Sequence, residues 1–176
     1  MTNGASALRG AAVLFIAAML QLVLVTSLVV AGGTPDLLLV VVIALGMLRG
    51  SVAGAVYGFF GGLLVDLLTL DTLGVTSLVL TLAGFWAGRY AETTGRGRRL
   101  APFIAVGMIT ALVGVFAFVL HYMLGEEVVA RDALLTTFAP MTVLNLALAL
   151  PVYLLVRWAV HDSVRHGAAP EVEVVV

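Results

Sequence analysis

The chain has 176 residues, of which 62% are hydrophobic and 11% are charged, and its formal net charge is −1. Soluble domains carry about 45–50% apolar and about 25% charged residues, so this composition excludes an ordinary soluble domain and favours a protein that uses the lipid bilayer as its solvent. Cysteine is absent, which excludes disulfides, thiol catalysis and cysteine-based metal sites.

The first predicted transmembrane span covers residues 11–31. Its apolar run has about the length that crosses a bilayer, and it exceeds the roughly 7–15 residues of a signal-peptide core. A second segment, 36–48, follows a turn in which Thr34 is predicted to cap the helix, Pro35 to occupy its first position and Asp36 to favour the positive end of the helix. Because this segment is short, we expect it either to cross the bilayer steeply or to form a re-entrant piece packed against its neighbours.

Further spans complete a single polytopic domain over residues 1–160. Pro140 and Pro151 are expected to bend the last of them, with neighbouring helices replacing the lost hydrogen bonds. Residues 161–176 are predicted to form a flexible cytoplasmic tail. The sequence therefore predicts an all-α membrane protein with six transmembrane helices, of which the last four lie at about 51–70, 73–90, 101–124 and 133–160.

The distribution of arginine orients these spans. All nine basic residues are arginine, and placing the N-terminus in the cytoplasm puts eight of the nine on the cytoplasmic side. This arrangement predicts cytoplasmic N- and C-termini in a multi-pass protein. The densest cluster follows the fourth span, and we interpret it as a topology signal that contacts anionic lipid, with docking of a cytoplasmic protein as the alternative. Its members are Arg89, Arg96, Arg98 and Arg99.

Glycines in the third and fourth spans have a regular spacing. Four of them in the third span are each four residues from the last, and such rows let helix backbones approach closely in a membrane. The fourth span carries a shorter Gly-x-x-x-Gly version. We therefore predict a helix-packing or partner-binding surface made of Gly50, Gly54, Gly58, Gly61, Gly62, Asp66, Gly74, Gly84 and Gly88.

Asp66 places a carboxylate inside an apolar run, at the next position of the glycine row. It lies roughly 24 Å along the helix from Gly50, which puts it in the outer part of the bilayer. A carboxylate at that depth can reach water or a polar partner. Structural pairing is the favoured interpretation, and partner docking and ion or substrate handling are the alternatives.

Sequence patterns that would indicate catalysis, a cofactor or a metal are missing. The loop from Gly95 to Arg99 lacks the third glycine of a phosphate-binding fingerprint. The adjacent residues His161, Asp162 and Ser163 cannot adopt triad geometry, and His161 and His166 have no third metal ligand near them. The sequence therefore predicts a protein that is not an enzyme, has no cofactor and does not bind nucleic acid.

Four segments follow one another in a set order: Pro35 to Gly50, Gly58 to Leu68, Leu73 with Gly74, and Gly84 to Gly88. Together they resemble the MreD family of rod shape-determining proteins. The resemblance covers roughly residues 11–160, and its specific part, about 35–88, includes the Gly62-Leu-Leu-Val-Asp66-Leu sequence. It implies a non-enzymatic scaffold of the bacterial cell-wall elongation machinery in the inner (plasma) membrane, which takes part in rod shape determination and in regulating peptidoglycan synthesis. The partners it implies are an MreC-like single-pass membrane protein, the peptidoglycan synthases RodA and a class B penicillin-binding protein, and MreB where that filament exists.

The resemblance also implies a fold similar to that of the substrate-binding subunits of energy-coupling-factor (ECF) transporters. This leaves a rival hypothesis, in which the chain captures a small molecule for a separate ATPase module. Such a subunit needs an outward pocket with several converging polar groups, and few polar side chains fall in the predicted outer halves of the spans. A membrane enzyme is the most distant alternative, because no cluster of acids or bases appears.

Overall fold

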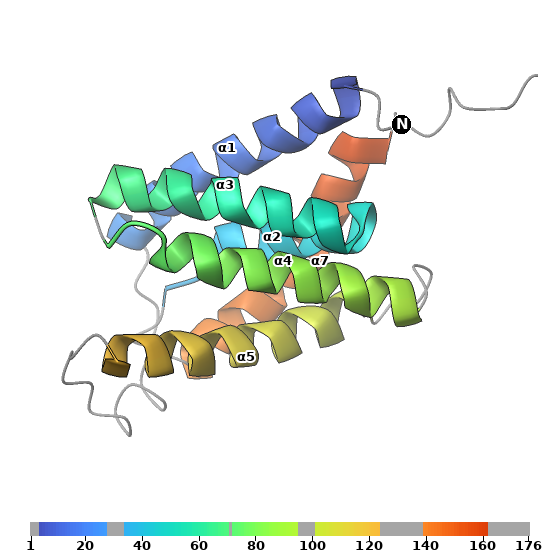
Figure 1. Cartoon of the computed structure of the whole chain (residues 1–176). Coiled ribbons are helices and arrows are strands. Elements are labelled where there is room, and N and C mark those ends of the chain that lie inside the picture. The colour runs from blue at the N-terminus through green and yellow to red at the C-terminus, as the bar shows by residue number, and fades with distance from the viewer. Residues whose placement is uncertain (1–3, 28–33, 71, 95–100, 124–138, 162–176) are drawn as a thin grey trace, which may run out of the picture.

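The computed structural model describes residues 4–27, 34–70, 72–94, 101–123 and 139–161. These residues form helices and short turns and include no strand, which confirms the all-helical prediction (Figure 1). In chain order the helices are α1 (Gly4–Ser27), α2 (Leu37–Arg49), α3 (Ser51–Thr69), α4 (Val75–Thr94), α5 (Ala101–Met123) and α7 (Ala139–His161).

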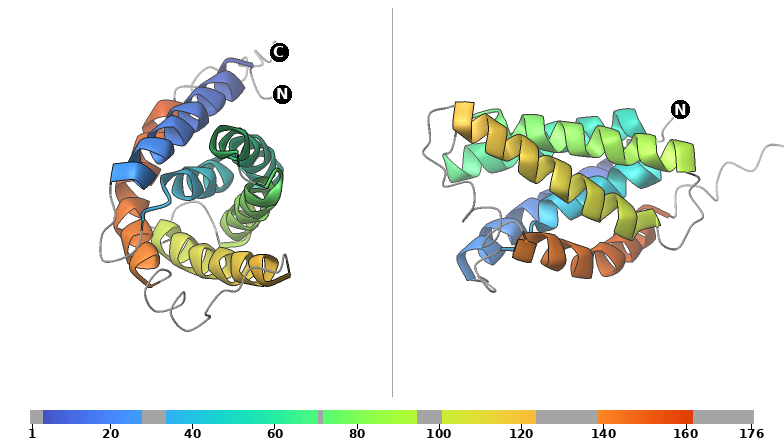
Figure 2. Two further views of the ribbon diagram at one scale, coloured as in Figure 1. Left: turned by 90° about the vertical axis from the view of Figure 1, so that its left-hand side faces the viewer. Right: turned by 90° about the horizontal axis from the view of Figure 1, so that it is seen from below.

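The short helix α2 is the centre of the bundle. It contacts α1, α3, α4, α5 and α7, and the end-on view in Figure 2 shows these helices arranged around it. Every residue from Leu38 to Met47 is buried. A helix that is apolar on all sides is stable only when it is covered on all sides, so the uniform Leu and Val composition of this segment explains its central place.

The start of α2 differs from the sequence prediction. The cap is Asp36, whose Oδ1 accepts a hydrogen bond of 2.9 Å from the backbone N–H of Leu39. The prediction that Thr34 caps the helix is therefore wrong, and Pro35 lies before the cap instead of in the first turn. A carboxylate both accepts this bond and complements the positive end of the helix dipole, which a threonine hydroxyl does not.

A single glycine joins α2 to α3. Gly50 has φ 98° and is both the C-cap of the first helix and the N-cap of the second. Its N–H donates to the carbonyl of Gly46 at 2.8 Å, and its carbonyl accepts from Gly54 at 2.9 Å. Because side chains disfavour this backbone conformation, glycine at position 50 lets two helices follow each other directly with the chain reversed between them.

The last described helix begins later than the predicted span. α7 starts at Ala139, so Pro140 lies in its first turn, where backbone N–H groups have no intrahelical acceptor in any case. Of the two prolines that were expected to bend this span, Pro151 lies inside the described helix. Residues 133–138 of the predicted span and the 162–176 part of the predicted tail lie outside the described residues.

The outer surface of the bundle is apolar and several polar side chains are inside. Val52, Leu70 and Trp158 are 74%, 91% and 82% exposed, whereas Asp66 and Asn145 are fully buried. By length and composition, two described helical segments can cross a bilayer, Ser51–Thr69 and Pro140–Val160. Three shorter apolar helical segments accompany them: Ala7–Val23, Leu37–Arg49 and Ala101–Phe116.

Candidate functional site

The glycine row of α3 lies directly against the backbone of α4. A Cβ on Gly54 would overlap the carbonyl oxygen of Gly84, and a Cβ on Gly58 would overlap that of Leu80. At Gly62 the obstacle is the backbone of Ser77. The two antiparallel helices therefore touch main chain to main chain along three turns, a distance of approach that only glycine permits.

The glycines of α4 complete this contact, which we call the α3–α4 glycine contact and define as Gly54, Gly58, Gly62, Gly84 and Gly88. A Cβ on Gly84 would overlap the carbonyl of Gly54, and one on Gly88 would overlap the backbone of Ser51. Each helix thus leaves its small residues where the other helix presents backbone atoms, and the contact buries all five glycines.

A further glycine, Gly46 of α2, joins the contact and was missed in the sequence analysis. A Cβ there would meet the carbonyl oxygen of Gly84 and the Cβ of Ala87. Gly46 stands four residues before Gly50, so the same spacing that singled out the row could have found it. Its inclusion makes the contact a meeting of α2, α3 and α4 instead of a helix pair.

The other predicted glycines have separate roles. Gly61 faces α1, where a Cβ would lie 3.0 Å from a methyl carbon of Leu14. Gly74 has φ 95° and open space around its Cβ position, so it is required by the backbone conformation of the turn and not by packing. Gly50 joins α2 to α3, as described above. The predicted set is therefore not one continuous surface.

Asp66 binds the N-terminus of α4. Its Oδ2 accepts hydrogen bonds from the backbone N–H of Gly74 at 2.8 Å and from that of Ser77 at 3.4 Å. The first N–H groups of a helix have no intrahelical acceptor and carry partial positive charge, so a carboxylate from the preceding helix suits this place. The Ser77 hydroxyl in turn donates to the carbonyl of Phe59 at 2.9 Å. The other oxygen of Asp66, Oδ1, has no hydrogen-bond partner among the residues that the structure describes.

Glu92, near the end of α4, binds the N-terminus of α3 in the same way that Asp66 binds the N-terminus of α4. The sequence analysis did not identify this residue. Its Oε1 accepts from the backbone N–H of Ser51 at 2.9 Å and from the Ser51 hydroxyl at 3.1 Å. Arg89 contacts its Oε2 at 3.4 Å. Glu92 could have been predicted from the antiparallel arrangement of the two spans, because this arrangement brings the end of α4 beside the start of α3.

A second polar group surrounds the buried N-terminus of α2. The Gln21 side-chain oxygen accepts from the backbone N–H of Leu37 at 2.7 Å, and the Asn145 oxygen accepts from that of Asp36 at 2.8 Å. These side chains come from α1 and α7, and Asn145 also reaches the hydroxyl of Thr110 on α5 at 3.5 Å. Four helices are therefore joined at one helix end.

The structure places only part of the predicted arginine cluster. Arg89 is on α4 with its side chain 55% exposed, while Arg96, Arg98 and Arg99 lie outside the described residues. Within the described ranges, no group of three or more His, Asp or Glu side chains is arranged to hold a metal ion. The site is thus built from glycine contacts and from carboxylates and amides bound to helix ends.

Such an arrangement of apolar outer surface, internal polar pairing and glycine-mediated helix contact defines a helical membrane protein. The family model for rod shape-determining protein MreD matches residues 6–160, nearly the whole chain. The chain therefore belongs to the MreD family, as its sequence resemblance indicated, and this membership gives it a role in rod shape determination. No curated protein and no solved structure matches the chain.

Proposed function

We propose that the chain crosses the bacterial plasma membrane six times, with both termini in the cytoplasm. The arginine distribution supports this topology, and so does the length of α3, whose 19 residues extend about 28 Å. In this topology the turn between α3 and α4 faces outward, and Asp66 lies in the outer part of the bilayer. The end of α4 that carries Arg89 and Glu92 faces the cytoplasm.

Within this membrane domain, the proposed function is that of a non-enzymatic scaffold of the cell-wall elongation machinery. It holds an MreC-like single-pass partner and acts with RodA, a class B penicillin-binding protein and, where present, MreB to regulate peptidoglycan synthesis. The observation that carries this proposal is the family match over residues 6–160. The interlocked α2, α3 and α4 supply what a scaffold needs, which is a fixed arrangement of helices.

The glycine row supports partner binding indirectly. Since Gly54, Gly58 and Gly62 are buried against α4, they are not a free docking surface. They fix the position of α3 relative to α4, and the partner binds the surface that results. A bulky side chain in the row is therefore expected to abolish the complex by separating the two helices.

The test is affinity purification of the full chain from gently solubilised membranes, followed by mass spectrometry of the co-purifying proteins. An MreC-like protein together with peptidoglycan synthases is the expected result. Gly58→Leu should lose them, whereas Val56→Leu, on the exposed face of the same helix, should keep them. Recovery of ATPase subunits in place of synthases would reject the scaffold function, and an intact complex with Gly58→Leu would reject the role of the glycine contact.

The cavities of the described residues do not favour the transport alternative. Three cavities among the described residues are lined mainly by Val, Leu, Ile and other apolar side chains. The side-chain oxygens of Gln21 and Asn145 already accept hydrogen bonds from the N-terminus of α2. Capture of a small polar molecule needs several free polar groups that converge on one cavity.

A further inference from the structure

A long groove runs between α4 and α5. It consists of two adjoining cavities of about 330 and 230 Å³, which share Trp86, Ile109 and Leu112. Along α4 it extends from Val79 to Thr93, roughly 21 Å at 1.5 Å per residue. We call it the α4–α5 groove.

The groove changes character along its length. One end is lined by Val79, Leu82, Val113 and Phe116, all apolar. The other end carries Trp86, Arg89, Tyr90 and Thr93, the side chains that concentrate at the boundary between hydrocarbon and lipid headgroups. In the proposed topology this polar end faces the cytoplasm. The groove therefore has the profile of an amphiphile with one apolar chain and a headgroup at the inner surface.

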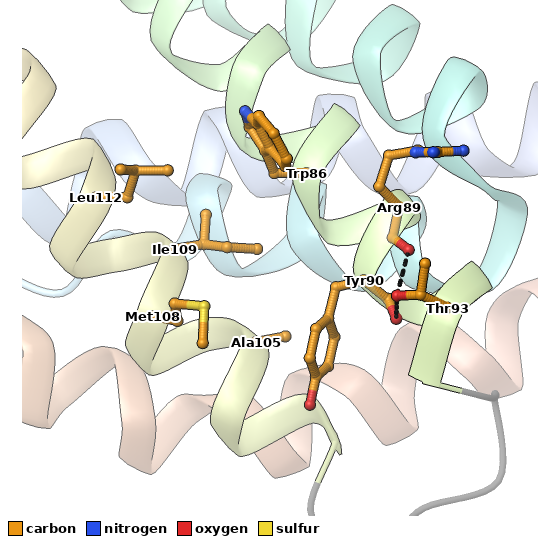
Figure 3. Close-up of a pocket in the computed structure, with 8 residues that line it drawn as sticks. All are labelled: Trp86, Arg89, Tyr90, Thr93, Ala105, Met108, Ile109 and Leu112. Carbon is orange, nitrogen blue, oxygen red and sulfur yellow. Dashed lines mark hydrogen bonds between the residues drawn. The ribbon is translucent and has the colours of Figure 1, made fainter.

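The close-up of the polar end shows how these side chains lie (Figure 3). Met108, Ile109 and Leu112 of α5 face Trp86 and Tyr90 of α4 across the cavity. The Arg89 guanidinium extends away from α5, although Arg89 is among the residues that line the cavity. Its contact with Glu92 is 3.4 Å long and its side chain is 55% exposed, so little free energy opposes exchange of that contact for another anion.

The size of the groove decides between two occupants. A transmembrane helix is about 10–12 Å across, so it could only lie over the groove along one face and could not enter it. An acyl chain is far thinner and needs only one leaflet, about 15 Å of the bilayer. The groove thus fits a lipid chain better than a partner helix.

We propose that the α4–α5 groove is a binding site for an anionic phospholipid of the inner leaflet. The acyl chain lies against Trp86, Ile109 and Leu112, and the exposed Arg89 side chain turns from Glu92 toward α5 to hold the phosphate with its guanidinium, which has five N–H donors. This site deepens the proposed function and rests on its topology, because only that topology brings the Arg89 end to the inner leaflet. Occupancy of the α4–α5 groove would then depend on the fraction of anionic lipid in the inner leaflet.

The experiment uses the two tryptophans of the chain as reporters in the full-length protein in lipid nanodiscs. Trp158→Phe leaves Trp86, which lines the groove, and Trp86→Phe leaves Trp158, which is 82% exposed and lines none of the described cavities. Phosphatidylglycerol or phosphatidylcholine with brominated acyl chains quenches whichever tryptophan it touches. Trp86 should be quenched at an about fivefold lower fraction of the anionic lipid than of the zwitterionic one, and Trp158 equally by both.

Arginine variants test whether Arg89 causes the preference for anionic lipid at Trp86. Arg89→Gln should abolish the fivefold difference at Trp86, whereas Arg157→Gln, an exposed arginine on α7, should leave it unchanged. Equal quenching of Trp86 by both lipids, or a preference that survives Arg89→Gln, would overturn the lipid site while leaving the scaffold function standing. Failure of either lipid to quench either tryptophan would overturn the lipid site and the proposed topology together.

Discussion

Asp66 and Glu92 hold opposite ends of the α3–α4 pair, because each lies near the end of one helix and binds the first backbone N–H groups of the other. Asp66 accepts from Gly74 at 2.8 Å, and Glu92 accepts from Ser51 at 2.9 Å. The glycine contact lies between them. The pair is thus fixed at three levels, by a charged bond at each end and by main-chain contact in the middle.

The glycine contact predicts a steep cost for small additions at Gly58. In Gly58→Ala the new methyl group meets the main chain of α4 at Leu80 and Thr81, which cannot move without shifting the helix. We expect the free energy of unfolding to fall by about 1–3 kcal/mol, measured as thermal unfolding in detergent micelles.

A matched control is Gly61→Ala on the same helix. Its methyl group would meet the end of the Leu14 side chain at 3.0 Å, and a side chain can change rotamer. The Gly61 variant should therefore be much less destabilised than the Gly58 variant. Equal losses at the two positions would show that backbone contact is not what makes glycine necessary at position 58.

Asp66 should tolerate loss of charge better than loss of its acceptor. Asp66→Asn keeps a carbonyl oxygen for the N–H groups of Gly74 and Ser77, and it relieves the burial of a charge whose Oδ1 has no partner within the described part of the chain. Asp66→Leu removes the cap, which costs about 1–2 kcal/mol. Thermal unfolding and partner co-purification should both follow this order. A folded Asp66→Asn protein that no longer holds its partner would mean that the charge itself is functional.

Glu92 should make stability depend on acidity. The backbone N–H of Ser51 and, less strongly, its hydroxyl and the Arg89 guanidinium hold the pKa of Glu92 below its ordinary value of 4.5, against the opposing effect of partial burial. Because the pKa is lower in the folded state, the stabilisation is complete above the ordinary value and is lost as the pH falls through the lowered one.

The Glu92→Gln variant isolates this contribution from that of other carboxylates. We expect the unfolding midpoint of the unmodified chain to exceed that of the variant near neutral pH, and the gap to close as the solution is acidified below the ordinary value of 4.5. Thermal unfolding of both proteins across this range measures the gap. A gap that stays constant with pH would show that ionised Glu92 does not secure Ser51.

The helical class and the importance of the glycines were predictable because they follow from composition and spacing, which act locally. The residues that cap the helices were harder to predict from the sequence. Thr34 and Asp36 are both good N-cap residues, and the choice depends on where the chain enters the bundle. Glu92 and Gln21 bind helix ends 41 and 16 residues away in the sequence, and no local pattern encodes such pairs.

The central helix shows the same limit. Its uniform apolar run fits a short crossing, a re-entrant piece or a buried core helix equally well, and only its contacts with every other described helix show that it is the core. The glycine row likewise looked the same as an internal contact or as a docking surface. Which of these it is depends on α4 and α2, whose approach to Gly54 and Gly58 the spacing alone does not reveal.

Gln21 and Asn145 should stabilise the N-terminus of α2 cooperatively, so that their removal lowers the free energy of unfolding in a non-additive way. Asn145→Leu leaves the buried N–H of Asp36 without an acceptor, and Gln21→Leu does the same to Leu37. Each substitution should cost about 1–3 kcal/mol, while Val143→Leu, at an exposed position of α7, should cost little. Once one partner is lost the helix end can fray, so the double variant should cost at least about 0.5 kcal/mol less than the sum of the single variants. Thermal unfolding of the three variants measures this difference, and strictly additive losses would mean that Gln21 and Asn145 support α2 independently.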